Sequence, residues 1–218
     1  MNREAWLAAR RLGVTGTDIA ACMGLNLYKS EEDVLLDKLG QGKPFFGNAA
    51  TRAGQRLEPL VANAWSQREQ VILTNGEFTI SGVNPRYIGT PDFLTGFGNG
   101  LEIKTGAWTT YKNGCPKMSE LQSRWYAFIT ERPIWDLVAC IVPKDRGEIP
   151  FHENDEVLLD WVSQQPHREF RFERDSGWEE QMMAAAERLL ARLDSLRGLP
   201  VACLPSSGPP ESCGESAL

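Results

Sequence analysis

The sequence has few of the residues that build zinc sites, disulfide frameworks or membrane spans. Its 218 residues include only two histidines, His152 and His167, and five cysteines that form no CxxC pair. An odd number of cysteines without paired spacing favours reduced thiols over disulfides or zinc. No apolar run is long enough to cross a bilayer, and the N-terminal segment MNREAWLAARR lacks the apolar core of a secretory signal. We therefore expect a soluble, intracellular protein.

The chain also lacks internal repeats, and its length is sufficient for one good hydrophobic core. With 42% hydrophobic residues, a single domain over residues 1–197 is the expected organisation. From Gly198 the sequence GLPVACLPSSGPPESCGESAL is rich in proline, serine and glycine. Such a composition cannot bury enough apolar surface to fold, so we expect residues 198–218 to form a flexible tail.

Hydrophobic periodicity and capping signals predict an α/β protein. Helices are expected at residues 3–12, just after Thr15, and at 30–40, 48–67, 117–131, 155–165 and 176–197. Strands are expected at residues 71–74, 77–80, 89–94, 100–105, 134–142 and 147–152. The last helix has an apolar stripe of Trp178, Met182, Ala185, Ala186, Leu189, Leu193 and Leu196, which we expect to pack on the core.

Two short segments, GTPDFL at residues 89–94 and GLEIKT at residues 100–105, flank the turn-rich stretch TGFGN. They predict a β-hairpin centred near Phe97, because a tight turn brings two strands together. Side chains alternate along a strand, so this register places Asp92 opposite Glu102, with Lys104 on the same face. Phe93, Leu101 and Ile103 then point to the opposite, apolar face.

Two carboxylates that face each other repel, and a divalent cation between them removes this repulsion. Oxygen ligands suit Mg²⁺, with Mn²⁺ as a possible substitute, and the carbonyl of Ile103 would add another oxygen. Lys104 would orient or deprotonate water, or stabilise negative charge. The hairpin therefore predicts metal-assisted hydrolysis of a phosphodiester. A surface hairpin with Glu and Lys on its solvent face has the same bare pattern, so the pattern alone leaves both interpretations open.

Pro91-Asp92 with Glu102-Ile103-Lys104 resembles the PD-(D/E)XK nuclease signature. Three further segments, in the same order as in the family, resemble the lambda-exonuclease or YqaJ-like viral recombinase branch of that superfamily: WLAARRLGVTGTDIAACMG, GQRLEP and LQSRWYAFITER. Together the four blocks cover roughly residues 6–142. The resemblance implies a restriction-endonuclease-like core, with a central mixed β-sheet flanked by helices.

The family's functional residues are transferred only to matching positions. The resemblance implies that Asp92, Glu102 and the Ile103 carbonyl bind metal and that Lys104 is the catalytic lysine. Glu58 would complete the acidic cluster directly or through water, and Gln122 would position water or the scissile phosphate. A pocket for the 5′-terminal phosphate is implied at Arg11, Thr17 and Thr90, and the adjacent Arg10 leaves the assignment between the two arginines open.

Each of these additional residues also has a simpler structural interpretation. Arg10 and Arg11 end a predicted helix, where basic side chains interact favourably with the helix dipole. Thr17 precedes an apolar run and is typical of a helix cap. Glu58 precedes Pro59, which interrupts a helical hydrogen bond and is able to kink the helix. Gln122, taken without the resemblance, is equally typical of a solvated helix residue.

The formal net charge of −6 argues at first against a DNA partner, because phosphate binding needs a basic surface. The distribution is uneven, however, and acidic residues concentrate after Pro143. Basic residues gather in the segments expected to face substrate: Arg3, Arg10, Arg11, Lys29, Arg52, Arg56, Lys112, Lys117 and Arg124. We therefore predict a local basic groove on an acidic protein. Aromatic residues and lysines in residues 107–118 are candidates for base and phosphate contacts.

The combined interpretation is a Mg²⁺-dependent 5′-to-3′ exonuclease that degrades one strand of double-stranded DNA from its ends. The resemblance alone implies the polarity, the 3′ single-stranded overhangs, a single-strand annealing partner, a ring-shaped homotrimer and a phage or prophage protein in the bacterial cytoplasm. Leu25 and Leu27 are candidates for a wedge that separates the duplex end. The alternatives are a restriction-like or structure-specific endonuclease, and an inactive DNA-binding recombination scaffold.

Overall fold

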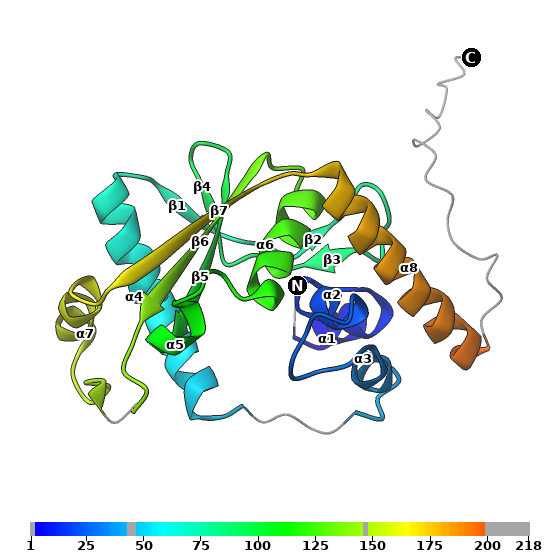
Figure 1. Ribbon diagram of the computed structural model, residues 1–218, viewed down its shortest axis with the longest axis horizontal. Helices are drawn as coiled ribbons and strands as arrows, with labels where there is room; N and C mark the ends of the chain where they lie inside the picture. Colours follow the sequence, from blue (N-terminus) through cyan, green and yellow to red (C-terminus); the bar gives the residue numbers. More distant parts are fainter. Residues whose placement is uncertain (1–2, 43–46, 146–147, 199–218) are drawn as a thin grey trace, which may run out of the picture.

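The computed structural model describes residues 3–42, 47–145 and 148–198, so the predicted tail at 199–218 lies outside the described residues. Its centre is a mixed sheet flanked by helices, as predicted, and the five strands lie in the order β1-β4-β5-β6-β7 (Figure 1). The strands are β1 (Leu73–Asn75), β4 (Phe93–Thr95), β5 (Gly100–Gly106), β6 (Ile134–Ile141) and β7 (His167–Glu173). A separate two-stranded sheet pairs β2 (Thr79–Ile80) with β3 (Ile88–Gly89).

The parallel pair β5 and β6 forms the middle of the sheet, and helix α6 (Lys117–Ile129) connects the two strands. Parallel strands need such a crossover, and this one covers one face of the sheet. On that face Trp125 and Trp135 are fully buried in the larger core cluster. On the opposite face α4 (Ala49–Glu69) packs against alternate residues of β5, Leu101 and Ile103, and α7 (Asp155–Ser163) packs against α4 in the same core cluster.

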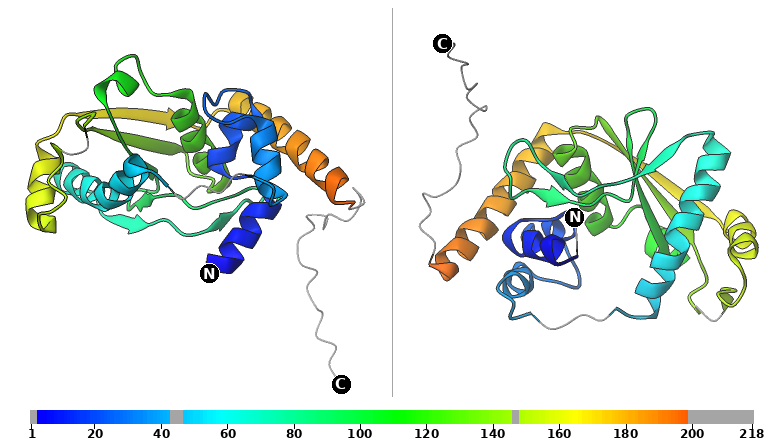
Figure 2. Two further views of the ribbon diagram at one scale, coloured as in Figure 1. Left: turned by 90° about the horizontal axis from the view of Figure 1, so that it is seen from below. Right: turned by 180° about the vertical axis from the view of Figure 1, so that it is seen from behind.

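Three short N-terminal helices and the last helix pack together beside α6. They are α1 (Arg3–Leu12), α2 (Gly16–Cys22), α3 (Glu31–Lys38) and α8 (Ser176–Arg197), and Figure 2 shows α8 running past the other three. The apolar stripe of α8 packs on the core as predicted, except that Leu196 is 61% exposed. A bridge between Val14 and Tyr87 joins this layer to the start of β3. The short helix α5 (Trp108–Tyr111) follows β5 directly.

The predicted strand at residues 89–94 is wrong as a continuous element. Ile88 and Gly89 pair with β2, whereas Phe93 and Leu94 pair with β5. Pro91 lies at the break, and proline has no N–H to donate to a β-ladder, so the chain changes sheets there. The strands on either side of Asn75-Gly76 likewise do not form a hairpin, because β1 pairs with β4 and β2 pairs with β3.

The predicted strand at 147–152 is also wrong. In the described residues 148–153 the chain forms turns, and the last strand of the sheet is β7, antiparallel to β6. Pro150 interrupts the first segment and disfavours a strand interior. By contrast, β7 alternates Phe170 and Phe172 with charged residues, the pattern expected for a half-buried strand. In the part of the chain that is described, no helix has the length and apolar character needed to cross a membrane.

Two glycines on neighbouring elements predict opposite effects on stability. A Cβ at Gly100 would lie 2.1 Å from the ring of buried Trp135, whereas one at Gly54 within α4 would meet only Thr105 Oγ1 at 3.6 Å. We expect Gly100→Ala to lower the free energy of unfolding by about 1–3 kcal/mol through overpacking. Gly54→Ala should raise it by roughly 0.5–1 kcal/mol, because alanine is the better helix former. Urea unfolding of both variants measures these two changes in the free energy of unfolding. A decrease for Gly54→Ala would contradict the free space for a methyl group between α4 and β5.

Candidate functional site

The predicted hairpin forms with its expected register. Phe93 pairs with Leu101 and Leu94 with Gly100, and this spacing continues to place Asp92 opposite Glu102. Asp92 Oδ2 accepts a hydrogen bond of 2.9 Å from the backbone N–H of Ile103, which fixes the carboxylate against β5. Leu101 and Ile103 lie in the core on the other face, as the alternation predicted. Two carboxyl groups therefore converge at the point where the chain leaves the smaller sheet.

Glu102 is completely buried, which the hairpin pattern alone does not predict. Its Oε1 forms an ion pair with the ammonium group of Lys104, two residues further along the same face. Its Oε2 has no hydrogen-bond partner among the described residues. A buried charge with an unsatisfied oxygen costs free energy, so a fold retains it only where another group completes it.

The pKa values of the groups in this cluster depart from their ordinary values. Burial raises the pKa of Glu102 to about 8, which Lys104 opposes and Asp92 reinforces. Burial also raises the pKa of Asp92, and it disfavours the charge on Lys104, but the two carboxylates raise the pKa of Lys104 above its usual value. Perturbed titratable groups of this kind are typical of functional sites, although structural ion pairs produce them as well.

The donor set fits a hard divalent cation. The unsatisfied Oε2 of Glu102 and the carboxylate of Asp92 are oxygen ligands, and Mg²⁺ commonly binds to proteins through only one or two carboxylates. Among the described residues no group of three His, Cys, Asp or Glu side chains is close enough to hold one ion. Two carboxylates and solvent are thus the ligands that the described side chains leave available, and the Ile103 carbonyl stays a prediction from the resemblance.

Glu58 lies on α4 and approaches the cluster without joining it. The pKa of Glu58 is raised to about 7, first by burial and then by the charge on Asp92, and Lys104 acts against both. Glu58 thus lies near Asp92 and Lys104, but it does not form a group of three possible metal ligands with Asp92 and Glu102. Helix α4 continues through Pro59, one residue later.

Gln122 and Tyr126 extend the cluster from α6. Gln122 Nε2 donates to the hydroxyl oxygen of Tyr126 at 3.3 Å, one helical turn away. Tyr126 is 5% exposed, and the pKa of its hydroxyl is raised by burial first and then by the charge of Glu102. The structure therefore adds Tyr126 to the site, which sequence reasoning missed. Its spacing of four residues from Gln122 was the available signal.

The residues expected to bind a terminal phosphate form a second cluster, the phosphate-type cluster, which consists of Arg10, Thr17 and Thr90 with Trp6. Arg10 Nη2 donates to Thr17 Oγ1 at 3.3 Å, and Trp6 Nε1 donates to Thr90 Oγ1 at 3.2 Å. The guanidinium of Arg10 stacks 4.6 Å from the centroid of the Trp6 ring. Arg10, Thr17 and Thr90 thus share one neighbourhood through direct contacts.

The Arg11 side chain makes no hydrogen bond to Thr17 or Thr90 within the described residues, although it lines the same cavity of about 410 Å³ as Arg10. Its carbonyl accepts a hydrogen bond of 3.2 Å from Arg197 on α8. The contacts thus favour Arg10 as the arginine beside Thr17.

Tyr126 joins the two clusters. A Cβ added at Gly16 would lie 3.0 Å from its ring, and one at Gly89 would lie 2.6 Å from it. These glycines directly precede Thr17 and Thr90. The ring therefore lies between the hydroxyls of the phosphate-type cluster and the carboxylates of the hairpin, and only glycine allows both backbones to approach it.

The predicted basic groove is partly neutralised. Ion pairs join Lys29 to Asp37, Arg56 to Asp155, and both Lys117 and Arg124 to Glu120. Exposed ion pairs of this type still reduce the local positive potential. Five of the predicted groove residues have no ion pair in the described part of the chain: Arg3, Arg10, Arg11, Arg52 and Lys112.

Two neighbouring loops have the exposure that the sequence suggested. Leu25 and Leu27 are 39% and 89% exposed. Trp108 is also exposed, and the guanidinium of Arg168 stacks over its ring at 5.5 Å, whereas Tyr111 is buried.

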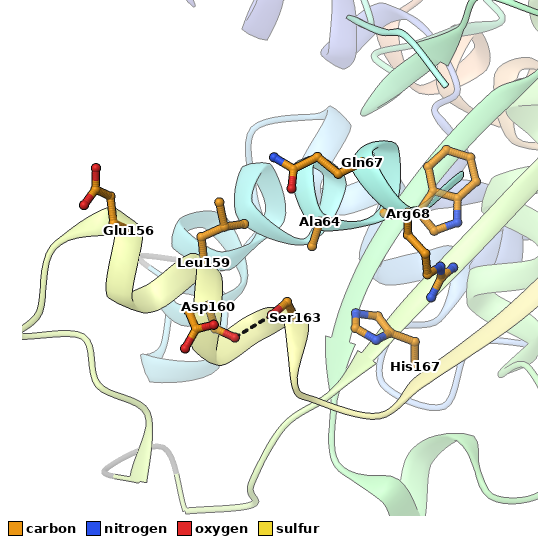
Figure 3. Close-up of a pocket in the computed structure, with 9 residues that line it drawn as sticks. Ala64, Gln67, Arg68, Glu156, Leu159, Asp160, Ser163 and His167 are labelled. Atoms are coloured by element: carbon orange, nitrogen blue, oxygen red, sulfur yellow. Dashed lines mark hydrogen bonds between the residues drawn. The ribbon is translucent and has the colours of Figure 1, made fainter. Parts of the chain in front are cut away.

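A separate open cavity of about 660 Å³ lies between α4 and α7 (Figure 3). Its lining includes Arg68, Asp160 and His167 but none of the predicted site residues.

Comparison with known proteins places the chain in a family. A family model described as the YqaJ-like viral recombinase domain matches residues 5–131, more than half of the chain. The chain belongs to this family. It is 32% identical over 105 residues to "Uncharacterized protein YqaJ" of Bacillus subtilis (strain 168). That match covers 43% of this chain and about a third of the relative's length, 33%.

Solved structures share the fold of this YqaJ-like protein. The alkaline exonuclease LHK-Exo of Laribacter hongkongensis, in its complex with dAMP, matches with a TM-score of 0.66 and 23% identity. This match covers 88% of this chain and 93% of that one. A phage-related exonuclease from Haemophilus somnus 129PT matches with a TM-score of 0.66 and 15% identity, covering 86% and 96%. At these identities the likeness establishes the architecture.

Cation binding should stabilise the protein through the paired carboxylates. At a concentration of 100 times the dissociation constant, Mg²⁺ or Mn²⁺ is expected to add roughly 2.7 kcal/mol to the free energy of unfolding. Asp92→Asn and Glu102→Gln should abolish this increase, measured as the rise in Tm after chelation and metal addition. Glu180→Gln, at an exposed position of α8, is the matched control and should keep the full rise. An equal rise in all four proteins would show that the cation binds elsewhere.

Proposed function

We propose that this YqaJ-like protein is a metal-dependent nuclease that hydrolyses phosphodiester bonds of DNA. The observation that carries the proposal is the completely buried Glu102, whose free Oε2 faces the same site as Asp92 while Oε1 is paired with Lys104. Stability alone does not favour this arrangement, because burying an ion pair and leaving one of its oxygens unsatisfied costs free energy of folding. A cation-binding hydrolytic site explains both features.

Asp92, Glu102 and the Ile103 carbonyl would hold Mg²⁺, or Mn²⁺ in its place. Such an ion, when bound, activates water and stabilises charge on the phosphate. The chain's own groups do the rest. Lys104, paired with Glu102, would orient water and stabilise negative charge on the phosphate. Gln122, which donates a hydrogen bond to Tyr126 on α6, would help to orient the substrate phosphate.

The family resemblance suggests the polarity, and the second cluster supports it. Arg10 and Thr17, with Thr90 held by Trp6, offer a guanidinium and two hydroxyls next to the hairpin. A guanidinium with hydroxyl donors suits a phosphate, and a phosphate there would mark the 5′ end of the strand to be cut. The proposed reaction is therefore 5′-to-3′ digestion of one strand of a duplex, which leaves 3′ single-stranded overhangs for annealing. The complex of LHK-Exo with dAMP is in keeping with a nucleotide in this fold.

A homotrimeric ring and a single-strand annealing partner remain predictions from the family resemblance. The wedge role of Leu25 and Leu27 also remains a prediction, supported by their exposure next to the phosphate-type cluster. Both leucines follow α2, the helix that begins beside Tyr126.

End-labelled linear duplex and covalently closed circular DNA test the activity. We expect Mg²⁺-dependent loss of the linear duplex from its 5′ ends, with circles left intact. Asp92→Ala and Lys104→Met should reduce the rate by at least about a hundredfold, since each removes charge stabilisation of the transition state. Glu180→Ala, at an exposed position of α8 outside both clusters, is the control. Cleavage of circles would instead favour the endonuclease alternative, and DNA binding without digestion would favour the scaffold.

Adjacent arginines provide a matched pair for the phosphate contact. Arg10→Ala should remove the preference for a 5′-phosphate over a 5′-hydroxyl end, because Arg10 is the residue bonded to Thr17. Arg11→Ala removes the same charge one residue away and should retain the preference. The measurement is the ratio of kcat/KM for the two duplexes. The reverse result would assign the phosphate to Arg11.

A further inference from the structure

Lys38 is a lysine that the proposed chemistry does not use, yet it is buried beside the phosphate-type cluster. The residue lies at the end of α3 and is 5% exposed. Its ammonium group donates to Asp18 Oδ2 at 2.9 Å, to the carbonyl of Arg10 at 3.0 Å and to the carbonyl of Gly13. A lysine has three N–H donors, so all of them are used.

Asp18 passes this interaction on to α2. Its Oδ2 also accepts from the backbone N–H of Thr15 at 3.1 Å and from the Thr15 hydroxyl at 2.8 Å. Burial acts to raise the pKa of Asp18, but Lys38 and the hydrogen bonds outweigh it and hold the pKa below its usual value. The carboxylate is therefore ionised and only accepts hydrogen bonds.

The hydroxyl hydrogens can then be assigned. Thr15 gives its hydrogen to Asp18, so the 3.0 Å contact between the hydroxyls of Thr15 and Thr17 has Thr17 as donor. Thr17 Oγ1 in turn accepts from Arg10. The contacts form a closed ring that runs Lys38, Asp18, Thr15, Thr17, Arg10 and, through the Arg10 carbonyl, back to Lys38.

The ring sets the spacing of two groups from different helices. Arg10 comes from α1 and Thr17 from α2. Lys38 on α3 binds both the Arg10 carbonyl near the end of α1 and the Asp18 carboxylate that caps the start of α2. Arg10 is half-buried and Thr17 exposed, whereas Lys38, Asp18 and Thr15 are buried. The inner members of the ring thus cannot reach a DNA end, but they fix the two members that can.

We propose that Lys38 and Asp18 are positioning residues for the terminal phosphate, holding the Arg10 guanidinium and the Thr17 hydroxyl at the separation that binds it. The inference rests on the proposed function of the Arg10 cluster and adds a device that controls end recognition. Neither residue touches the phosphate. When a phosphate binds, Thr17 turns its hydrogen from Thr15 to a phosphate oxygen, while Asp18 keeps Thr15 in place.

The test is a double variant, Asp18→Asn with Lys38→Met, because removing both partners avoids an unpaired buried charge. The two readouts are the ratio of kcat/KM for 5′-phosphorylated over 5′-hydroxyl duplexes, and the ratio of affinities of the same duplexes measured by fluorescence anisotropy in Ca²⁺. We expect both ratios to fall at least about tenfold, through KM for the phosphorylated end, with kcat within about twofold of wild type. Lys38→Met alone should behave in the same way if it folds.

A second ion pair controls for lost stability. Arg86 and Asp194 form a bond of 2.6 Å with both side chains 14% exposed, and Asp194 is outside the ring. Asp194→Asn should lower Tm while leaving both ratios unchanged. The proposal is overturned if the folded double variant keeps the wild-type ratios, or if Asp194→Asn lowers them as much.

The binding readout separates this inference from the proposed nuclease. Wild-type protein that digests no DNA but binds phosphorylated ends preferentially, with the preference lost in the double variant, would support the inference and overturn the nuclease. Wild-type protein that binds both ends equally would overturn the inference, even if it digests DNA.

Discussion

Burial of the Glu102 carboxylate is the constraint on which the site depends. The group lies in the parallel centre of the sheet, where water does not reach its oxygens, and its charge is balanced by Lys104 on the same strand. Most proteins avoid such a group or satisfy it fully. Here one oxygen has no hydrogen-bond partner among the described residues. The surrounding elements place further polar side chains near it: Asp92 comes from the hairpin, Glu58 from α4, and Gln122 and Tyr126 from α6.

Tyr126 gives this arrangement its compactness. An aromatic ring that touches two glycine-containing backbones allows the N-terminal helices to pack directly against the face that carries the carboxylates. Close packing of this kind transmits small displacements, because protein interiors have few voids. The phosphate-type cluster and the carboxylate cluster are consequently parts of one surface, although Arg10 and Thr17 are more than 70 positions from Asp92 in the chain.

Much of the fold followed from local patterns. The hairpin register, the core face of β5 and the helix caps at Ser30 and Asn48 are consequences of alternation and capping chemistry. Strand β7 was missed because charged residues dominate its sequence, although Phe170 and Phe172 alternate as a half-buried strand requires. The break at Pro91 was not foreseen, because pairing with two different sheets depends on contacts that are distant in sequence.

The site was less accessible to sequence reasoning. Which of Arg10 and Arg11 reaches Thr17 depends on the rotational phase of α1 relative to α2, and no local pattern encodes that phase. Tyr126 resembles an ordinary core aromatic on an amphipathic helix until its hydroxyl is found beside Gln122 and the charges of β5. The complete burial of Glu102 likewise required α6 to be placed on the sheet.

The break between β3 and β4 has one more consequence. Thr90 and Asp92 are separated only by Pro91, whose ring restricts the backbone, so these two side chains are held at a nearly fixed distance. A two-residue segment extends at most about 7 Å. In the proposed enzyme this segment would fix the distance between the bound terminal phosphate and the bond to be cut.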